Sequence, residues 1–252
     1  MSEPGYFGLA AAPNGSLVTF AYSSNVYSIN PSTGFPTLVG ASGLDDCTTV
    51  TSSCGPTSAA TLGGMDGTIY ATDFQNNLYR VDPITGVATL IGATGIPSIP
   101  FNPGTLNPDG TINFYDEAIF GAGGKLYETF DAVVFDLTSW SIVSTVVDPA
   151  LYQIDPVTGL ATIIGPTDLG IGGVAGVNGT YFAFNDFTNQ INSLDLASGN
   201  TSFVANFDPA AGVIQGASPV PTPEPASLAL VGSGLVAIAT RLRRARSIQR
   251  PS

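Results

Sequence analysis

The sequence contains no histidine, and this absence excludes several chemistries at once. Histidine is the most common general base and the most common side-chain metal ligand, and it is a member of every Ser-His-Asp triad. The composition therefore excludes a hydrolase of the triad type and a histidine-ligated metal centre. Any catalytic function would have to rely on carboxylates or on a bound cofactor.

Basic residues are almost as scarce. Only Arg80 and Lys125 precede Pro221 among the seven basic residues, whereas 18 of the 19 acidic residues lie in the same part, which carries a net charge of about −16. Such a charge repels the phosphates of nucleic acids and the headgroups of anionic lipids. We expect no nucleic-acid partner for this part of the chain. A neutral glycan, or an anionic polymer bridged by cations, fits the charge better.

Cysteine is limited to Cys47 and Cys54, which lie close together in a segment rich in threonine and serine. In an exported protein, this spacing predicts a disulfide that closes one short loop. The alternative is a cysteine-based zinc site, but the sequence offers it no further ligands nearby.

The abundant residues predict an all-β fold. Hydrophobic residues make up 44% of the chain, and 30 glycines and 19 prolines are spread along it. A chain of this kind can bury a sizeable core, and its glycines and prolines divide it into many short strands.

A strand-turn-strand pattern recurs four times. Apolar strands flank the turns Asp82-Pro83-Ile84-Thr85-Gly86 and Asp155-Pro156-Val157-Thr158-Gly159, with divergent copies at 30–34 and 195–199. Aspartate caps such a turn, proline presets φ, and glycine adopts the left-handed conformation. The aspartates could also form a metal-binding or catalytic ring, but turn capping is the better interpretation. The residues interpreted as structural are Asp82, Pro83, Gly86, Asp155, Pro156 and Gly159.

A second element, a glycine turn that leads into a strand, precedes each copy. The glycines are Gly15, Gly67, Gly124 and Gly179. They recur roughly every 55 residues, which is the length of one four-stranded β-propeller blade. We therefore predict a β-propeller-like domain over residues 1–218 with about four or more blades. A β-sandwich and a β-solenoid are the competing architectures.

Two irregularities accompany the repeat. The third unit contains an insertion, which we interpret as an added hairpin carrying the only tryptophan, Trp140. Residues 213–216 resemble the first strand of a fifth unit, or a strand that closes the ring. The first residues contain neither a basic start nor an apolar run, so we expect the start to be truncated or assigned too far downstream.

The repeat resembles the Leu-Tyr-x-Ile-Asp-Pro-x-Thr-Gly blades of exported propellers of the NHL and quinoprotein-like kind. The residues that carry the resemblance are 78–86 and 151–159. The resemblance is loose and implies an architecture, not an activity.

The end of the chain has three parts in a fixed order. A proline-rich linker at 219–225 contains Pro223-Glu224-Pro225, and an uncharged apolar stretch follows it. The basic tail contains Arg241, Arg243, Arg244 and Arg246. The three parts together resemble the PEP-CTERM sorting signal of exported bacterial proteins. The resemblance implies cleavage by an exosortase, a membrane protease-transpeptidase of bacteria that make extracellular polysaccharide.

The physical properties of the tail agree with this resemblance. A helix over the uncharged residues 226–240 would span roughly 22 Å, which is short of the ~30 Å hydrocarbon core but can cross if the bilayer thins. The arginines place the C-terminus in the cytoplasm. We expect a membrane helix with its basic tail over 226–246. A buried core helix is the alternative.

We find no convergent active site in the sequence. The loops 73–77 and 185–189 carry oxygens at a spacing that calcium could use, but hairpin loops explain them better. Asp45-Asp46 and Asp116-Glu117 are adjacent pairs, and neighbours on a strand point to opposite faces. We therefore expect no catalytic residue, no metal and no cofactor. The expected function is a non-enzymatic propeller at the cell surface or in the exopolysaccharide. A secreted polysaccharide lyase or glycosidase, and an ordinary periplasmic propeller, are the alternatives.

Overall fold

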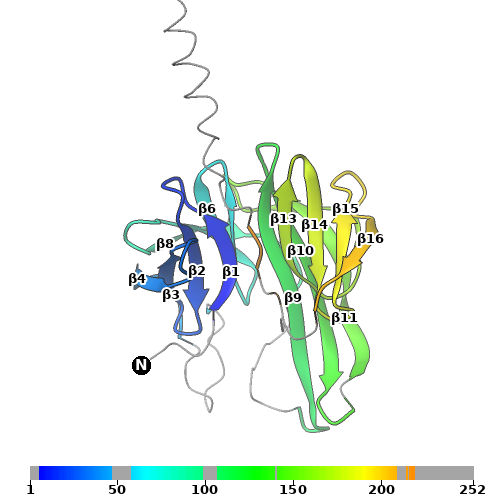
Figure 1. Cartoon of the computed structure of the whole chain (residues 1–252). Helices are drawn as coiled ribbons and strands as arrows, with labels where there is room; N and C mark the ends of the chain where they lie inside the picture. The colour runs from blue at the N-terminus through cyan, green and yellow to red at the C-terminus, as the bar shows by residue number, and fades with distance from the viewer. Residues whose placement is uncertain are drawn as a thin grey trace, which may run out of the picture. The chain divides into compact units, whose positions relative to one another are not determined.

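The computed structural model describes residues 6–46, 58–98, 107–139, 141–208, 214 and 216–218. These residues form four antiparallel sheets of four strands each, and in every sheet the strands follow one another in chain order. We call the sheets blades 1 to 4 (Figure 1).

The strands of the first two blades are short. Blade 1 consists of β1 (Tyr6–Ala11), β2 (Leu17–Ala21), β3 (Asn25–Ile29) and β4 (Pro36–Ala41). Blade 2 consists of β5 (Ala59–Met65), β6 (Thr68–Asp73), β7 (Asn77–Val81) and β8 (Ala88–Ala93).

Blade 3 is the largest, and blade 4 returns to the short form. Blade 3 consists of β9 (Thr111–Ala122), β10 (Lys125–Asp136), β11 (Ser141–Ile154) and β12 (Ala161–Pro166). Blade 4 consists of β13 (Ile171–Val177), β14 (Thr180–Asn185), β15 (Gln190–Leu194) and β16 (Thr201–Asn206).

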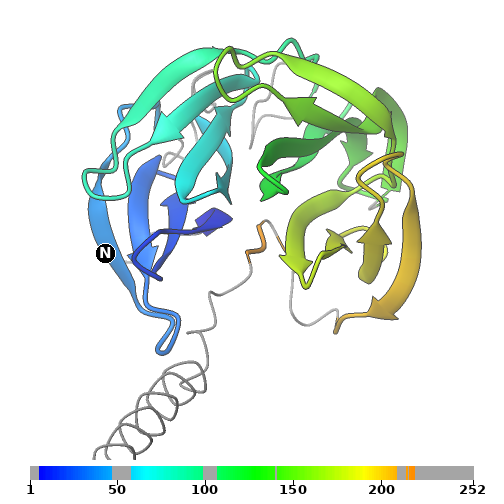
Figure 2. The same cartoon turned by 90° about the horizontal axis from the view of Figure 1, so that it is seen from above.

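The four blades are arranged around a central axis, with β1, β5, β9 and β13 innermost (Figure 2). This arrangement confirms the predicted all-β propeller and excludes the sandwich and the solenoid. The turns that join the first two strands of blades 2 and 4 contain Asp66-Gly67 and Asn178-Gly179, and all four of these residues have positive φ. The spacing of the glycines in the sequence therefore predicts these hairpins correctly.

The extra length of blade 3 differs from the added hairpin that we predicted. The insertion lengthens β10 and β11 themselves to 12 and 14 residues, and β9 pairs with β10 along its whole length. Bulges interrupt the β10–β11 pairing near Phe130 and Val134. The aromatic rings of Phe114, Phe135 and Phe187 meet around this extension, with centroids 6.0–6.4 Å apart. Trp140 lies outside the described residues.

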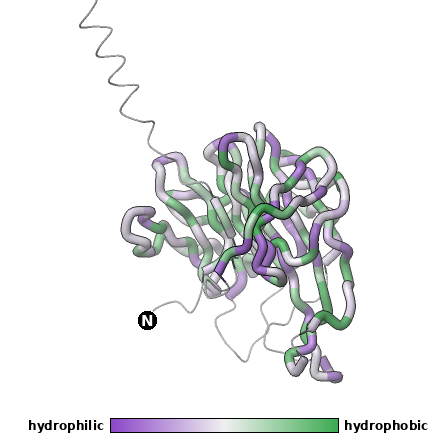
Figure 3. Tube along the Cα trace, turned by 45° about the vertical axis from the view of Figure 1, so that its right-hand side comes forward, coloured by the Kyte–Doolittle hydropathy of each residue, from purple (hydrophilic) through white to green (hydrophobic). Residues whose placement is uncertain are grey.

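Apolar side chains fill the space between neighbouring blades. Alternate residues along each strand point to opposite faces, and hydrophobic and hydrophilic residues are interspersed along the trace (Figure 3). Phe20 of blade 1 packs in one cluster with Leu62 and Ile69 of blade 2. Tyr70 of blade 2 packs with Leu126 of blade 3. Each sheet is therefore buried on the faces that it shares with its neighbours.

A close contact between turn and glycine joins blades 1, 2 and 3. The Asp-Pro turn of one blade presses against a glycine in the outermost strand of the blade before it. A Cβ atom on Gly40 would lie 2.1 Å from the carbonyl oxygen of Thr85, and a Cβ atom on Gly92 would lie 2.4 Å from that of Thr158. The same contact joins blades 3 and 4, where Gly165 meets the carbonyl oxygen of Ser198. These outer-strand glycines therefore have a packing role, which differs from the turn role of Gly86 and Gly159.

The junction between blades 4 and 1 is different. Ala205 occupies the position of the outer-strand glycine in blade 4. A Cβ built on Gly34 in the turn of blade 1 has no atom of the described residues within 4 Å, its chain neighbours aside. A segment from the end of the propeller lies at this junction instead. We call Ile214 and 216–218 the clasp (coloured orange in Figure 2).

Close backbone contacts hold the clasp between the innermost strands. A Cβ on Gly216, whose φ is +128°, would lie 2.6 Å from the carbonyl carbon of Gly8 in β1. A Cβ on Gly173 in β13 would lie 3.2 Å from the carbonyl carbon of Gly216. Neither Ile214 nor Gly216 belongs to a strand, so these two residues begin no fifth blade. They lie where a ring-closing segment was expected, but in an irregular conformation.

Candidate functional site

The predicted turn residues lie at the outer ends of the blades. The carboxylate of Asp82 accepts a hydrogen bond from the backbone N of Ile84 at 2.8 Å. The carboxylate of Asp155 accepts hydrogen bonds from the backbone N of Val157 and from the Thr158 hydroxyl, both at 2.9 Å. Gly86 and Gly159, which follow the prolines Pro83 and Pro156, have φ values of +81° and +85°. Each aspartate therefore bonds within its own turn.

These hydrogen bonds explain the acidity of the turn aspartates. Donation from the backbone N of Ile84 lowers the pKa of Asp82, and donation from the backbone N of Val157 lowers the pKa of Asp155. Both side chains are exposed. The aspartates belong to separate blades and do not converge on a common site.

The two loops with calcium-like spacing are hairpin loops. The Asp73 carboxylate accepts hydrogen bonds from the backbone N atoms of Gln75 and Asn77 and from the hydroxyl of Tyr79, all at 2.9 Å. Burial and the bond to Asp73 raise the pKa of Tyr79. In the second loop, Asn185 accepts a hydrogen bond from the backbone N of Thr188 at 3.0 Å. No group of three metal-ligating side chains stands together among the described residues.

Four carboxyl groups on the two innermost strands of blade 3, of which Glu117 is half-buried and the others are buried, form the least expected feature. Asp116 and Glu117 of β9 point to opposite faces, as their adjacency in the strand requires. Asp116 lies directly opposite Asp131 of β10 in the strand register. Glu117 lies opposite Phe130, two residues from Glu128, so Glu117 and Glu128 share the other face. Each face of this strand pair therefore carries two carboxyl groups.

Burial raises the pKa of these carboxyl groups, so they stay protonated at pH values where an exposed carboxyl group is ionised. Asp116 and Asp131 are each 2% exposed, and Glu128 is fully buried. Desolvation raises the pKa of Asp131 to about 7 and that of Glu128 to about 8. Desolvation, followed by repulsion from Asp131 and then Asp186, raises the pKa of Asp116 well above its ordinary value. Desolvation and repulsion from Glu128 do the same for Glu117.

Sequence reasoning considered the pair Asp116-Glu117 only as neighbours and missed their partners across the strands. The available signal was the run from Leu126 to Phe135, in which Glu128 and Asp131 interrupt an otherwise apolar strand. Charged residues in such a strand are almost never fully buried unless they are paired. Only the register between β9 and β10 shows that the pairs consist of like groups.

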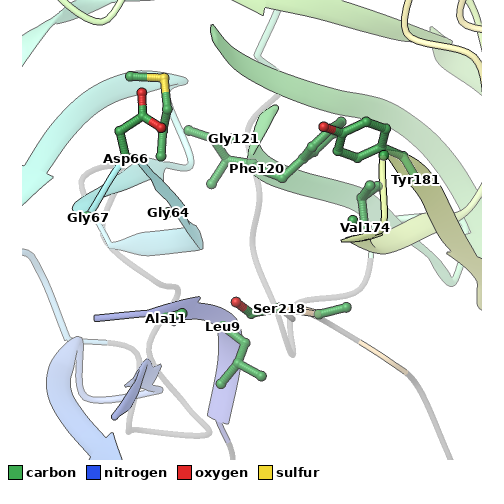
Figure 4. Close-up of a pocket in the computed structure, with 15 residues that line it drawn as sticks. Leu9, Ala11, Gly64, Asp66, Gly67, Phe120, Gly121, Val174, Tyr181 and Ser218 are labelled. Carbon is green, nitrogen blue, oxygen red and sulfur yellow. The ribbon is translucent and has the colours of Figure 1, made fainter. Parts of the chain in front are cut away.

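A cavity of about 280 Å³ lies at one end of the ring, and all four blades contribute to its lining. Figure 4 shows Asp66 and Tyr181 on opposite sides of it. Phe120 lies beside Tyr181, with ring centroids 6.2 Å apart. The clasp supplies Ala217 and Ser218. The remaining lining is mostly small: Leu9, Ala11, Gly64, Met65, Gly67, Ile119, Gly121, Val174, Gly176 and Gly179.

The cavity offers two kinds of contact. Aromatic and apolar surface comes from Phe120 and Tyr181, and polar contacts come from Asp66 and Ser218. No lysine or arginine is among the described residues that line it. It can therefore hold a small neutral polar molecule, whereas a free anion would meet a carboxylate and no balancing cation.

Several predicted residues lie outside the described part of the chain. These are the cysteines Cys47 and Cys54, the motif Pro223, Glu224 and Pro225, and the arginines Arg241, Arg243, Arg244 and Arg246. The disulfide and the membrane helix over 226–246 therefore remain predictions. Within the described residues, no helix is long and apolar enough to cross a membrane.

The geometry defines the class of protein as a four-bladed β-propeller. Residues 221–244 match the PEP-CTERM protein-sorting motif, which confirms the interpretation of the tail. The chain is thus an exported protein that is anchored at the membrane, processed by exosortase and then released to the cell surface. No curated protein matches the chain.

Solved structures resemble the propeller at low sequence identity. A PQQ-bound aldose sugar dehydrogenase from Streptomyces coelicolor is 13% identical over 85% of this chain and 71% of that chain, with a TM-score of 0.48. A chain of a nidogen/laminin complex is 13% identical over 84% of both chains, with a TM-score of 0.47. Glutaminyl cyclase from Myxococcus xanthus is 12% identical over 78% of this chain and 68% of that chain, with a TM-score of 0.39. These structures include enzymes, and the similarity extends to the fold alone.

Proposed function

We propose that the mature protein is a non-enzymatic propeller that binds extracellular polysaccharide at the cell surface. The observation that carries the proposal is the sorting motif at residues 221–244, which follows directly on a propeller with a cavity at one end of its ring. Export brings the propeller into contact with surface polymers, and the cavity supplies a place to hold one.

The chemistry of the cavity supports a neutral sugar as the ligand unit. A sugar ring presents an apolar face, which can stack on Tyr181 or Phe120, and hydroxyl groups, which can donate to the Asp66 carboxylate. The acidic surface supports the same choice, since an anionic polymer would need bridging cations.

The position of the buried carboxyl groups supports binding rather than catalysis. Carboxyl groups with a raised pKa can act as general acids. Asp116, Asp131, Glu117 and Glu128 are absent from the cavity lining, so a ligand in the cavity would not reach them. The alternative, a secreted polysaccharide lyase or glycosidase, would require such a group within hydrogen-bonding distance of the ligand.

Binding of the full-length protein to exopolysaccharide from its native host, measured with and without a chelator, tests the proposal. We expect binding that persists with the chelator and that weakens in Tyr181→Ala. The matched control is Tyr22→Ala, which removes an exposed tyrosine that is not part of the cavity lining. Equal binding by both variants would rule out the cavity as the site. Release of shortened or unsaturated sugars by pure protein would establish the enzymatic alternative instead.

A further inference from the structure

Two buried carboxyl groups and one partly buried carboxyl group lie along the boundary between blades 3 and 4. Asp116 comes from β9, Asp131 from β10 and Asp186 from the turn between β14 and β15. We call them the Asp116 cluster. Asp131 lies opposite Asp116 in the register, and the charges of Asp131 and Asp186 both act on Asp116. The cluster lies on the face of blade 3 that packs against blade 4, the same face as Ala118 and Phe120.

The hydrogen bonds of the cluster are incomplete. The backbone N of Gly170 donates to Asp131 Oδ2 at 2.8 Å, and the backbone N of Ile214 donates to Asp186 Oδ1 at 2.8 Å. Four buried oxygens have no hydrogen-bond partner among the described residues: both carboxyl oxygens of Asp116, Oδ1 of Asp131 and Oδ2 of Asp186. Each buried acceptor without a donor is costly, and more so when it is charged.

No lysine or arginine in the described part of the chain balances the charge of the cluster. Arg80 and Lys125 are the only basic residues in the part of the chain that the structure describes, and both are exposed. The charged groups that act on Asp116 are both acidic, Asp131 from the neighbouring strand and Asp186 from blade 4. Glu117 and Glu128 face blade 2 from the opposite side of the sheet, where Asp73 also acts on Glu117. A proton is therefore the available means of reducing the charge.

The cluster is connected to the clasp. Asp186 Oδ1 accepts the hydrogen bond from the backbone N of Ile214. A Cβ atom on Gly172 of β13 would lie 2.4 Å from Asp186 Oδ2 and 2.8 Å from the carbonyl oxygen of Ile214, so the three groups are tightly packed. The clasp in turn fills the junction between blades 4 and 1, only a few residues before the sorting motif begins at residue 221.

We propose that a proton retained on Asp116 fastens blade 4 and the clasp to blade 3, and that loss of this proton to solvent loosens the clasp. Asp131 and Asp186 each already accept one backbone hydrogen bond, whereas Asp116 accepts none. Its O–H group is therefore the donor available to the remaining oxygens of the cluster. Once this proton is lost, three carboxylates face one another across the blade junction.

The order of ionisation agrees with this assignment. Desolvation raises the pKa of Asp186 to about 6 and that of Asp131 to about 7. Ionised Asp186 is the better acceptor for the backbone N of Ile214, so the first proton loss does not release the clasp. Asp116 accepts no backbone hydrogen bond, and desolvation followed by repulsion from Asp131 and Asp186 raises its pKa well above its ordinary value. The clasp should therefore loosen as rising pH removes the proton from Asp116.

Hydrogen exchange at the Ile214 amide in the full-length protein tests the proposal. Protection of this amide, corrected for the intrinsic exchange rate, should be constant below about pH 4, the pKa of a solvated aspartate, and fall by up to about tenfold per pH unit as the pH rises toward the raised pKa of Asp116, as linkage to one proton requires. In Asp116→Asn the amide supplies a permanent N–H donor, so protection should persist into the alkaline range.

Glu128→Gln is the matched control, because it removes a buried carboxyl group from the same strand pair on the face toward blade 2. This variant should keep the pH profile of the wild type. If Asp116→Asn does not fold, Asp186→Asn replaces it. Asparagine at this position still accepts the hydrogen bond from the backbone N of Ile214 but cannot ionise. The pH profile of Ile214 protection in this variant should also be flat. A wild-type profile without pH dependence, or the wild-type decline in a folded cluster variant, would overturn the proposal.

Discussion

At the scale of single residues, the turn aspartates show how one side chain holds a local conformation. The carboxylate of Asp82 accepts hydrogen bonds from the backbone N atoms of Ile84 and Thr85, at 2.8 and 3.3 Å. We expect Asp82→Ala to lower the free energy of unfolding by about 1 kcal/mol, the usual effect of losing a side-chain cap. Chemical denaturation of the two proteins measures the change.

Asp82→Asn is the control for this prediction. Its amide oxygen can accept the same backbone hydrogen bonds, so its stability should stay within a few tenths of a kcal/mol of the wild type, as for interchangeable capping residues. Neither substitution should affect polysaccharide binding. A loss of binding at unchanged stability would contradict the structural role and indicate a site at this turn.

Residue identity predicted the turns well because their chemistry is local. Aspartate, proline and glycine act within five consecutive positions, so the printed sequence contains the whole interaction. The buried carboxyl pairs could not be predicted in the same way. Asp116 and Asp131 become neighbours only through the register of β9 on β10. Their raised pKa depends on burial by blade 4, which no local pattern encodes.

At the scale of elements, the junctions between blades depend on glycines in the outermost strands. Gly92 in β8 meets the carbonyl oxygen of Thr158 from the next blade, at 2.4 Å from an ideal Cβ position. The added methyl group in Gly92→Ala would force the two blades apart. We expect a loss of about 1–3 kcal/mol in the free energy of unfolding, the range for overpacking, measured by denaturant titration.

Gly64→Ala provides the comparison for the junction. The nearest atom to its added methyl group is 3.5 Å away, an ordinary contact. Neither Gly64 nor Gly92 has a positive φ. The Gly64 variant should therefore be clearly more stable than the Gly92 variant. Equal stabilities of the Gly64→Ala and Gly92→Ala variants would mean that the contact between the turn and the outer-strand glycine does not hold the blades together.

The repeat also explains why the element order was predictable and the closure was not. Four copies of strand, glycine turn, strand and a five-residue turn that ends in glycine predict four equivalent sheets. The junction between blades 4 and 1 has no second copy to compare with, because Ala205 stands in place of the outer-strand glycine and the clasp lies between the innermost strands. A single irregular segment held by backbone contacts at Gly8 and Gly173 produces no periodic signal.

At the scale of the whole molecule, the sorting motif predicts a change of covalent structure after export. We expect cleavage beside Pro223-Glu224-Pro225 and therefore a mature protein that lacks residues 228–250 but keeps the clasp. Intact-mass measurement of protein from the native host tests this prediction. Recovery of the complete C-terminus from the cell exterior would contradict it.

The opposite pKa shifts of buried and exposed carboxyl groups predict how stability depends on pH. The buried groups have raised pKa values, about 8 for Glu128 and about 7 for Asp131. They remain protonated in the folded protein at pH values where they have already ionised in the unfolded chain, so stability falls as the pH rises from about 4 through these values. The exposed turn aspartates have lowered pKa values, so their contribution is lost as the pH falls below about 4.

Together these shifts place the maximum of the free energy of unfolding near pH 4 to 5, with a long decline toward about pH 8. Urea unfolding of the full-length protein at a series of pH values measures the curve. The double variant Glu128→Gln/Asp131→Asn, which removes one ionisable group from each face of blade 3, should flatten the alkaline decline and leave the acid side unchanged. Stability that rises between pH 5 and 8 would show that the buried carboxyl groups are ionised and stabilised in the folded protein. In that case the acidic body would need a bound cation, because the two basic residues among those that the structure describes are both exposed.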